Sequence, residues 1–159
     1  MPVKQLSVFI ENKPGKLVEA LETLGNADID LRALSLADTS DFGILRAIVD
    51  KPDKALEALN EAGFLVKSNE VLAVVIGDRP GGLAAVVRIL SEVSVNIEYT
   101  YAFVGPCVLT EPGALNESQS PHNKDSAYVI IRVDDNEAAI QALTSCGVTL
   151  LTEKELYSM

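Results

Sequence analysis

Hydrophobic and polar residues change their spacing several times along the first seventy residues of the chain. Short runs rich in valine and isoleucine indicate strands, whereas apolar residues three or four positions apart indicate helices. Leu17, Leu21 and Leu24 recur at helical spacing, and Gly63 stands where the end of a helix requires a positive φ. The pattern predicts strands at 3–10, 29–36, 44–49 and from 64 to 67, with helices at 14–26 and 52–62.

The same order of elements occurs a second time. The run Asn-Lys-Pro-Gly-Lys-Leu at 12–17 returns as Asp-Arg-Pro-Gly-Gly-Leu at 78–83, so that Pro80 stands 66 positions after Pro14. The pair Val49-Asp50 returns as Val133-Asp134, 84 positions later. The second copy predicts strands at 71–76, 95–103, 127–133 and 148–151, and helices at 81–93 and 136–146.

The second copy is 18 residues longer than the first, and the extra residues fall at about 104–125. Glycine, proline, asparagine and serine cluster in this segment, which is typical of turns and loops. A mobile insert is favoured over a functional lid because the segment has few apolar residues to anchor it. The repeats therefore predict two domains, at 1–69 and at 70–159, the second with a loop insert.

Each repeat has the order βαββαβ, which predicts an antiparallel sheet with helices on one face and places the chain in the α+β class. An edge strand or the second face of each sheet is left open. We therefore expect the two repeats to pack together, and the whole chain to form a homo-oligomer, most simply a dimer.

The composition narrows the possible partners. The chain of 159 residues has 23 acidic and 13 basic residues, a net charge of −10, and no two adjacent lysines or arginines. Nucleic acid is therefore excluded as a partner. No segment has the length of a membrane span or the pattern of a signal peptide, so we expect a cytoplasmic protein without a membrane partner. Cys107 and Cys146 have no metal or redox spacing, and Cys146 is expected in a helix core.

The repeated Pro-Gly turns carry the candidate binding chemistry. Each turn ends a strand and opens a helix, whose first N–H groups have no partner within the helix and lie at its positive end. The pattern predicts available N–H groups at 15–17 and at 81–83, which suit a carboxylate without any basic cluster. The alternative interpretation is structural: Asn12 and Asp78 would merely cap the two helices.

The two copies together resemble the ACT domain. The strand, Pro-Gly turn and helix are followed by Ala-Asp-Ile-Asp-Leu at 27–31 and by Val-Ser-Val-Asn-Ile at 93–97. The likeness covers nearly the whole chain except 104–125, and it is greatest to free-standing tandem ACT proteins. It implies ferredoxin-like domains that bind a free amino acid and regulate a metabolic enzyme. It also implies a ligand between paired domains, held by the Pro-Gly turn of one and the start of the second strand of the other.

Serine-sensing members have asparagine in the turn position taken here by Asn12 and in the strand position taken by Asp30 and Asn96. The candidate ligand-binding residues are Asn12, Lys13, Pro14, Gly15, Lys16 and Leu17 with Asn96 and Ile97, and Asp78, Arg79, Pro80, Gly81, Gly82 and Leu83 with Asp30. An amide can bind both ends of an amino acid, whereas two carboxylates repel the acid group. The site with Asn12 and Asn96 is therefore expected to bind, and the site with Asp78 and Asp30 to bind weakly.

Two other classes of function remain open. A hydrolase similar to acylphosphatase would share this topology, but it requires a positioned arginine, for which Arg79 is the only candidate in the turns. The single histidine, His122, lies in the insert without metal or catalytic partners at a useful spacing. We therefore expect no catalysis, no metal and no cofactor, with a protein-interaction module that binds no ligand as the alternative to a sensor.

Overall fold

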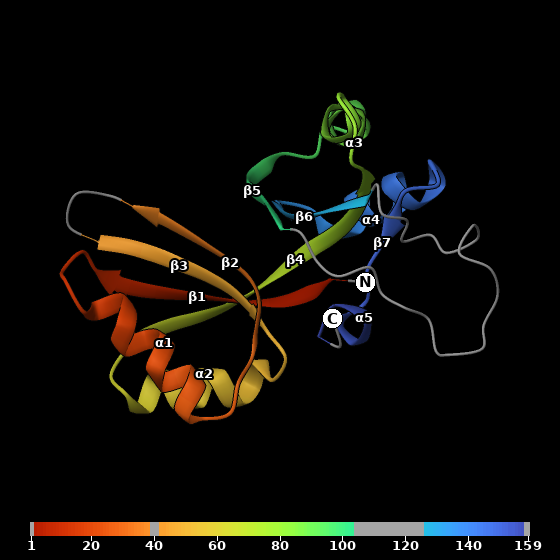
Figure 1. The fold of residues 1–159 in the computed structure, drawn as a ribbon. Coiled ribbons are helices and arrows are strands. Elements are labelled where there is room, and N and C mark those ends of the chain that lie inside the picture. The colour runs from red at the N-terminus through yellow and green to blue at the C-terminus, as the bar shows by residue number, and fades with distance from the viewer. Residues whose placement is uncertain (1, 39–41, 104–125, 158–159) are drawn as a thin grey trace. The chain divides into compact units, whose positions relative to one another are not determined.

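The computed structural model describes residues 2–38, 42–103 and 126–157. The expected insert at 104–125, with Cys107 and His122, lies outside the described residues. The chain forms two compact units (Figure 1). The first contains Val3–Glu70 together with the C-terminal helix α5 (Glu153–Tyr157), and the second contains Val71–Thr152.

The first unit contains β1 (Val3–Glu11), α1 (Lys16–Asn26), β2 (Leu31–Asp38), β3 (Phe42–Val49), α2 (Pro52–Glu61) and the first part of β4 (Leu65–Gly77). The strand order is β2-β3-β1-β4. β3 is antiparallel to both neighbours, with Leu45 opposite Val8 of β1 and Leu36 of β2. This is the βαββαβ order that the sequence predicts.

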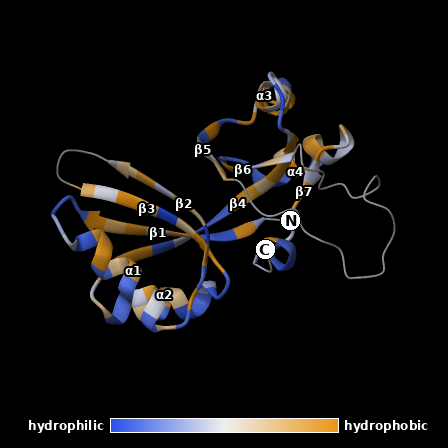
Figure 2. Cartoon of the chain, in the orientation of Figure 1, coloured by the Kyte–Doolittle hydropathy of each residue, from blue (hydrophilic) through white to orange (hydrophobic). Residues whose placement is uncertain are grey.

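The core of the first unit lies between the sheet and its two helices. Alternate residues of β1 and β3 face this core because side chains of a strand point to opposite faces in turn. Helix α1 contributes Ala20 and Leu24, and α2 contributes Ala55 and Leu59. Figure 1 shows the two helices side by side on one side of the strands, and in Figure 2 hydrophobic and hydrophilic colours alternate along them. Both helices are therefore amphipathic and cover one face of the sheet.

The second unit repeats this arrangement. It contains the rest of β4, α3 (Gly82–Glu92), β5 (Ile97–Phe103), β6 (Ser126–Val133), α4 (Asn136–Ser145) and β7 (Thr149–Leu150). The order is β7-β4-β6-β5, with antiparallel pairing throughout. Leu72, Val74 and Val129 of the strands pack against Val86 and Leu90 of α3. The α+β class and the ferredoxin-like repeats are thus confirmed.

Helices α1 to α4 end in the same way. The residue after the closing turn donates its N–H to the carbonyl five residues earlier. Ile29 donates to Leu24 (3.1 Å), and Val148 donates to Leu143 (2.9 Å). The turn requires a positive φ, which glycine adopts most easily. Gly147 has φ 74°, and just before it Cys146 forms the cap of α4 and is exposed. The prediction that Cys146 lies in the core is therefore wrong.

Helix α5 has no counterpart in the sequence prediction, which assigned all of 70–159 to the second domain. In the structure α5 belongs to the first unit, where its side chains bind the backbone of Lys4. The Lys4 N–H donates to Glu153 Oε1 (3.1 Å), and the Tyr157 hydroxyl donates to the Lys4 carbonyl (3.4 Å). Burial raises the pKa of Tyr157 above its usual range. A segment of five residues is too short for its periodicity to predict a helix. Its position in the first unit therefore follows only from these tertiary contacts.

Candidate functional site

Both Pro-Gly turns place a glycine in the left-handed region at the start of a helix. Gly15 has φ 89° and caps α1, and Gly81 has φ 84° and caps α3. Glycine is required because a Cβ makes this conformation costly. The sequence suggested that Pro14 and Pro80 lie in the first helical turn. The helices instead begin at Lys16 and Gly82, so both prolines precede the caps.

The turns bind part of their own backbone. The N–H of Lys16 donates to the Lys13 carbonyl (3.2 Å), and the N–H of Gly82 donates to the Arg79 carbonyl (3.0 Å). The sequence predicted available N–H groups at 15–17 and at 81–83. For Lys16 and Gly82 this prediction is wrong, because a tight turn closes with its own hydrogen bond. The N–H groups of Leu17 and Leu83 donate to no backbone carbonyl within the described part of the chain.

The cap positions of α1 and α3 do not belong to Asn12 and Asp78. Both are glycines, which make no side-chain capping hydrogen bond. Asn12 and Asp78 stand three residues before these caps, outside the helices. An uncapped helix N-terminus leaves its first N–H groups for water or for a ligand.

The two turns differ in charge. In the first, Lys13 pairs with Glu11 (2.8 Å) and Lys16 pairs with Glu19 (2.7 Å). These hydrogen bonds lower the pKa of Glu11 and raise the pKa of Lys16. In the second turn a glycine replaces Lys16, and Arg79 makes no ion pair with any described residue. The Arg79 guanidinium therefore has no carboxylate partner in the described part of the chain, unlike the two lysines of the first turn.

A pocket of about 580 Å³ opens at the second turn. The turn lines it with Gly77 and with residues 79–82, and Ser126 and Thr149 add hydroxyl groups. Apolar side chains complete the wall: Val75, Ile76, Ala85, Val86 and Val148. The lining therefore joins one guanidinium and a helix N-terminus to hydroxyl and apolar groups.

Gly82 permits the close approach that shapes this pocket. A Cβ on Gly82 would stand 2.4 Å from the Gly77 carbonyl oxygen, a distance that atoms do not tolerate. The side chain of Arg79 lies against Gly77, with Nε 3.6 Å from the position of a Cβ there. Lys16 takes the place of Gly82 in the first repeat, so this close approach belongs to the second turn.

The other candidate residues lie where β2 and β5 begin. The N–H of Asp30 donates to Asp50 Oδ1 (2.8 Å), and the N–H of Asn96 donates to Asp134 Oδ1 (3.0 Å). In return Asp50 and Asp134 donate their own N–H groups to the carbonyls of Asp30 and Asn96. The repeated Val-Asp pair signals these two aspartates in the sequence, but they were not predicted as site residues.

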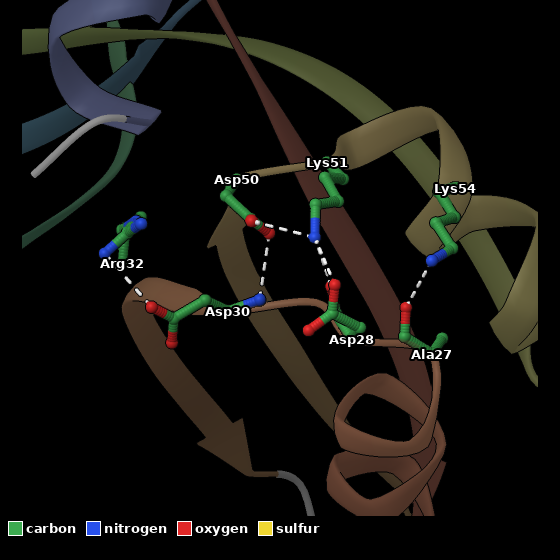
Figure 3. A network of polar contacts seen from close by, with 7 residues as sticks. All are labelled: Ala27, Asp28, Asp30, Arg32, Asp50, Lys51 and Lys54. Atoms are coloured by element: carbon green, nitrogen blue, oxygen red, sulfur yellow. Dashed lines mark hydrogen bonds and ion pairs between the residues drawn. The ribbon is translucent and has the colours of Figure 1, made fainter.

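The charge of Asp30 is compensated. Its carboxylate lies 3.1 Å from the guanidinium of Arg32, in the network that Figure 3 shows. The repulsion of an acid group that the sequence suggested for Asp30 is therefore reduced. Asn96 and Ile97 line a second hollow, of about 370 Å³, at the end of α3. Each expected pairing of a turn with a strand start joins residues of the two different units and stays a prediction.

Within the described ranges, no group of three or more histidine, cysteine or acidic residues could hold a metal ion. Nor does any described helix have the length and apolar character needed to cross a membrane.

Comparison with known proteins gives the family. A family model described as an ACT domain pair matches residues 1–159. Protein BT0572 from Bacteroides thetaiotaomicron is 38% identical, with 100% of this chain and 98% of that chain covered and a TM-score of 0.85. No curated protein matches the chain.

Regulatory subunits of aspartate kinase share the fold. The subunit from Thermus thermophilus is 20% identical over 89% of this chain and 91% of that chain, with a TM-score of 0.58. The subunit from Thermus flavus is 17% identical over 91% and 92%, with a TM-score of 0.57. The matched model spans both repeats, and the chain belongs to the family of ACT domain pairs.

Proposed function

We propose that the protein is a non-catalytic sensor that binds a free amino acid and regulates a metabolic enzyme. The carboxylate of the ligand binds at the second Pro-Gly turn. One observation carries this proposal: the 580 Å³ pocket combines the N-terminus of α3 with Arg79, which pairs with no carboxylate of a described residue. Membership of a family of ACT domain pairs supports the regulatory role, and the named neighbours include regulatory subunits.

The contrast between the two turns favours the second. A carboxylate is attracted by the N–H groups and the dipole at a helix N-terminus, and a guanidinium adds charge and two parallel donors. Lys13 and Lys16 of the first turn already pair with glutamates, whereas Arg79 pairs with no acidic residue that the structure describes. This ranking of the two turns is the opposite of the one that the sequence suggested from Asn12 and Asp78.

The rest of the pocket suits the remaining parts of an amino acid. Asp78 does not line the pocket, but it is exposed in the turn next to Arg79 and carries the charge that an ammonium group requires. Ser126 and Thr149 offer hydroxyl groups, and Ile76 and Val148 offer apolar surface to a side chain. Ligands of this kind bind in mostly apolar hollows with a few placed polar groups.

A thermal-unfolding screen of the full chain against the twenty amino acids tests the sensor. An amino acid at one hundred times its dissociation constant should stabilise the protein by about 2.7 kcal/mol. A shift from one or a few of them supports the proposal. If no amino acid raises the melting temperature, the sensor hypothesis is wrong, and a protein-interaction module that binds no ligand becomes the better explanation.

Arg79→Gln tests the turn itself. The variant should weaken binding of the amino acid found in the screen about 5–10-fold, because an exposed charge-assisted hydrogen bond contributes about 1 kcal/mol or slightly more. Isothermal titration calorimetry measures the change. Arg88→Gln is the matched control, since Arg88 is exposed on α3, the helix that follows this turn, and does not line the pocket. If both variants bind the amino acid with equal affinity, its carboxylate does not bind at Arg79.

The homo-oligomer is a dimer that forms along β2. β2 is the edge strand of the sheet in the first unit, so its outer edge pairs with none of the described strands. Leu34 and Leu36 are 52% and 46% exposed on it, and such an edge favours pairing with another chain. Leu36→Lys should convert the dimer to a monomer in light scattering, whereas Leu65→Lys, at an exposed leucine of β4, should not. A monomeric native protein would refute this assembly.

A further inference from the structure

Strand β4 extends beyond the short strand that covers one of its edges. β7 pairs with β4 only at Val74 and Val75, whereas β4 continues to Gly77. The Leu151 N–H donates to the Ala73 carbonyl (2.8 Å), so the backbone groups of Ala73 face the side of β7. Alternate residues of a strand direct these groups to the same side, so those of Gly77 face this side as well. No described strand lies beside Gly77 there.

The end of α4 explains why β7 stops short. Thr149 lies opposite Val75, so in the same register Gly147 would stand opposite Gly77. Gly147 has φ 74°, and its N–H donates to the Thr144 carbonyl (3.0 Å). Its backbone therefore closes the turn after α4 and does not continue the strand. One strand position on the edge of β4 is left open at Gly77.

The pocket at the second Pro-Gly turn includes this open position. Gly77 lines the pocket of about 580 Å³, and residues 147–149 line it as well. Arg79 and the start of α3, where the proposed carboxylate binds, belong to the same lining. A ligand that fills the pocket therefore meets both a carboxylate-binding turn and a strand edge without a partner strand.

The lining of the pocket does not require a free ammonium group. None of the described residues that line it is acidic. Its polar side chains are those of Arg79, Ser126 and Thr149, which supply one cation and two hydroxyl groups. A hydroxyl group accepts the N–H of a peptide bond as well as that of an ammonium group. The pocket is therefore complementary to a carboxylate that ends a polypeptide as well as to that of a free amino acid.

We propose that this pocket docks the C-terminal residue of a partner protein, and that a free amino acid competes with it. The docking rests on the carboxylate site of the proposed function. The terminal carboxylate binds at Arg79 and the start of α3, and the carbonyl of the preceding peptide group accepts from the Gly77 N–H. Sheet edges bind extended peptides, and backbone N–H groups bind terminal carboxylates, in this way.

The wall of the pocket sets the character of the partner's last residue. Ile76, Val86 and Val148 form part of this wall, so the last side chain is apolar. A free amino acid occupies the same carboxylate and side-chain positions but has no preceding carbonyl. Its binding therefore releases the partner, and this release is the regulatory output of the sensor.

Four fluorescein-labelled tetrapeptides that end in valine, leucine, isoleucine or phenylalanine test the docking site by fluorescence anisotropy with the full chain. At least one should bind with a free C-terminus, and amidation of that peptide should weaken binding about 10–100-fold, because it removes the charge that the turn attracts. The same peptide ending in aspartate should bind more weakly, since the wall is apolar. Equal binding of acid and amide, or no binding of any peptide, would overturn the proposal.

Two substitutions of Gly77 test the strand edge. Gly77→Pro removes the N–H that the peptide carbonyl requires, whereas Gly77→Ala keeps it. The added Cβ meets only the Arg79 side chain, at ordinary contact distances of 3.6 Å or more. The proline variant should bind the peptide about 5–10-fold more weakly than the alanine variant, and the two should bind the free amino acid equally. Equal peptide affinities of the two variants would contradict the strand edge.

Hydrogen exchange of the native chain remains informative if Gly77→Pro does not fold. A saturating concentration of the acid peptide should slow exchange of the Gly77 amide at least about fivefold, because the bound carbonyl protects it. The amidated peptide at the same concentration should have little effect. Unchanged exchange of this amide with the acid peptide bound would refute the contact.

Competition separates the docking site from the sensor. The amino acid found in the screen should displace the peptide with an inhibition constant equal to its own dissociation constant. Arg79→Gln should weaken the acid peptide about 5–10-fold, and Arg88→Gln should not. Peptide binding when no amino acid binds would refute the sensor and support the docking site. An amino acid that binds without displacing the peptide, or that binds when no peptide does, would refute the docking site alone.

Discussion

Gly82→Ala should lower the free energy of unfolding by about 1–3 kcal/mol and abolish binding at the second turn. The added Cβ would stand 2.4 Å from the Gly77 carbonyl oxygen, a backbone atom, and a Cβ has no torsion by which it could turn away. Relief requires the end of β4 and the start of α3 to separate, which moves the N–H groups and Arg79 that line the pocket. Urea unfolding and calorimetry measure the two effects.

Gly25→Ala is the matched control for this substitution. A Cβ on Gly25 meets nothing within 4 Å, and the residue lies inside α1. Alanine is the better helix former, so this variant should be more stable by about 0.5–1 kcal/mol and should bind ligand unchanged. A Gly82→Ala protein as stable as the native chain would show that β4 and α3 do not approach so closely.

Leu90→Ala should cost about 2–5 kcal/mol, the largest loss expected from any single change here. The side chain is fully buried between α3 and the strands of the second unit, and its removal leaves a cavity. Hydrogen exchange should accelerate mainly within 71–152, because the two core clusters share no residue.

Leu24→Ala provides the converse test. Leu24 takes the place of Leu90 in the first repeat and is 1% exposed. Its truncation should cost a similar amount and accelerate exchange mainly within 3–70. If either variant accelerates exchange equally in both units, the two cores are a single cooperative structure.

The position of α5 and the charge pairing around the candidate sites could not be predicted from the sequence. Periodicity over eleven residues was enough to predict α1 and α3, whereas five residues at 153–157 gave no signal. Asp30 looked like a repulsive carboxylate until Arg32 was found 3.1 Å away. Such pairings depend on side chains meeting in three dimensions, and spacing along the chain does not report them.

The exposure of Cys146 shows the same limit. Its place in an apolar helical pattern predicted burial, but the helix ends one residue earlier, at Ser145. A difference of one residue at a helix end turns a core position into a cap. Helix ends are set by the closing turn, here with Gly147 at φ 74°, and not by periodicity alone.

The sequence by itself determined the repeat, the order of strands and helices, and the two glycines that open α1 and α3. These follow from local rules: the period of apolar residues, and the φ that only glycine adopts easily. The tertiary structure decided which N–H groups remain available, which charges are already paired, and where hollows form. These properties depend on contacts between distant segments, such as Gly82 with Gly77 and Lys51 with Asp28, which local patterns do not encode.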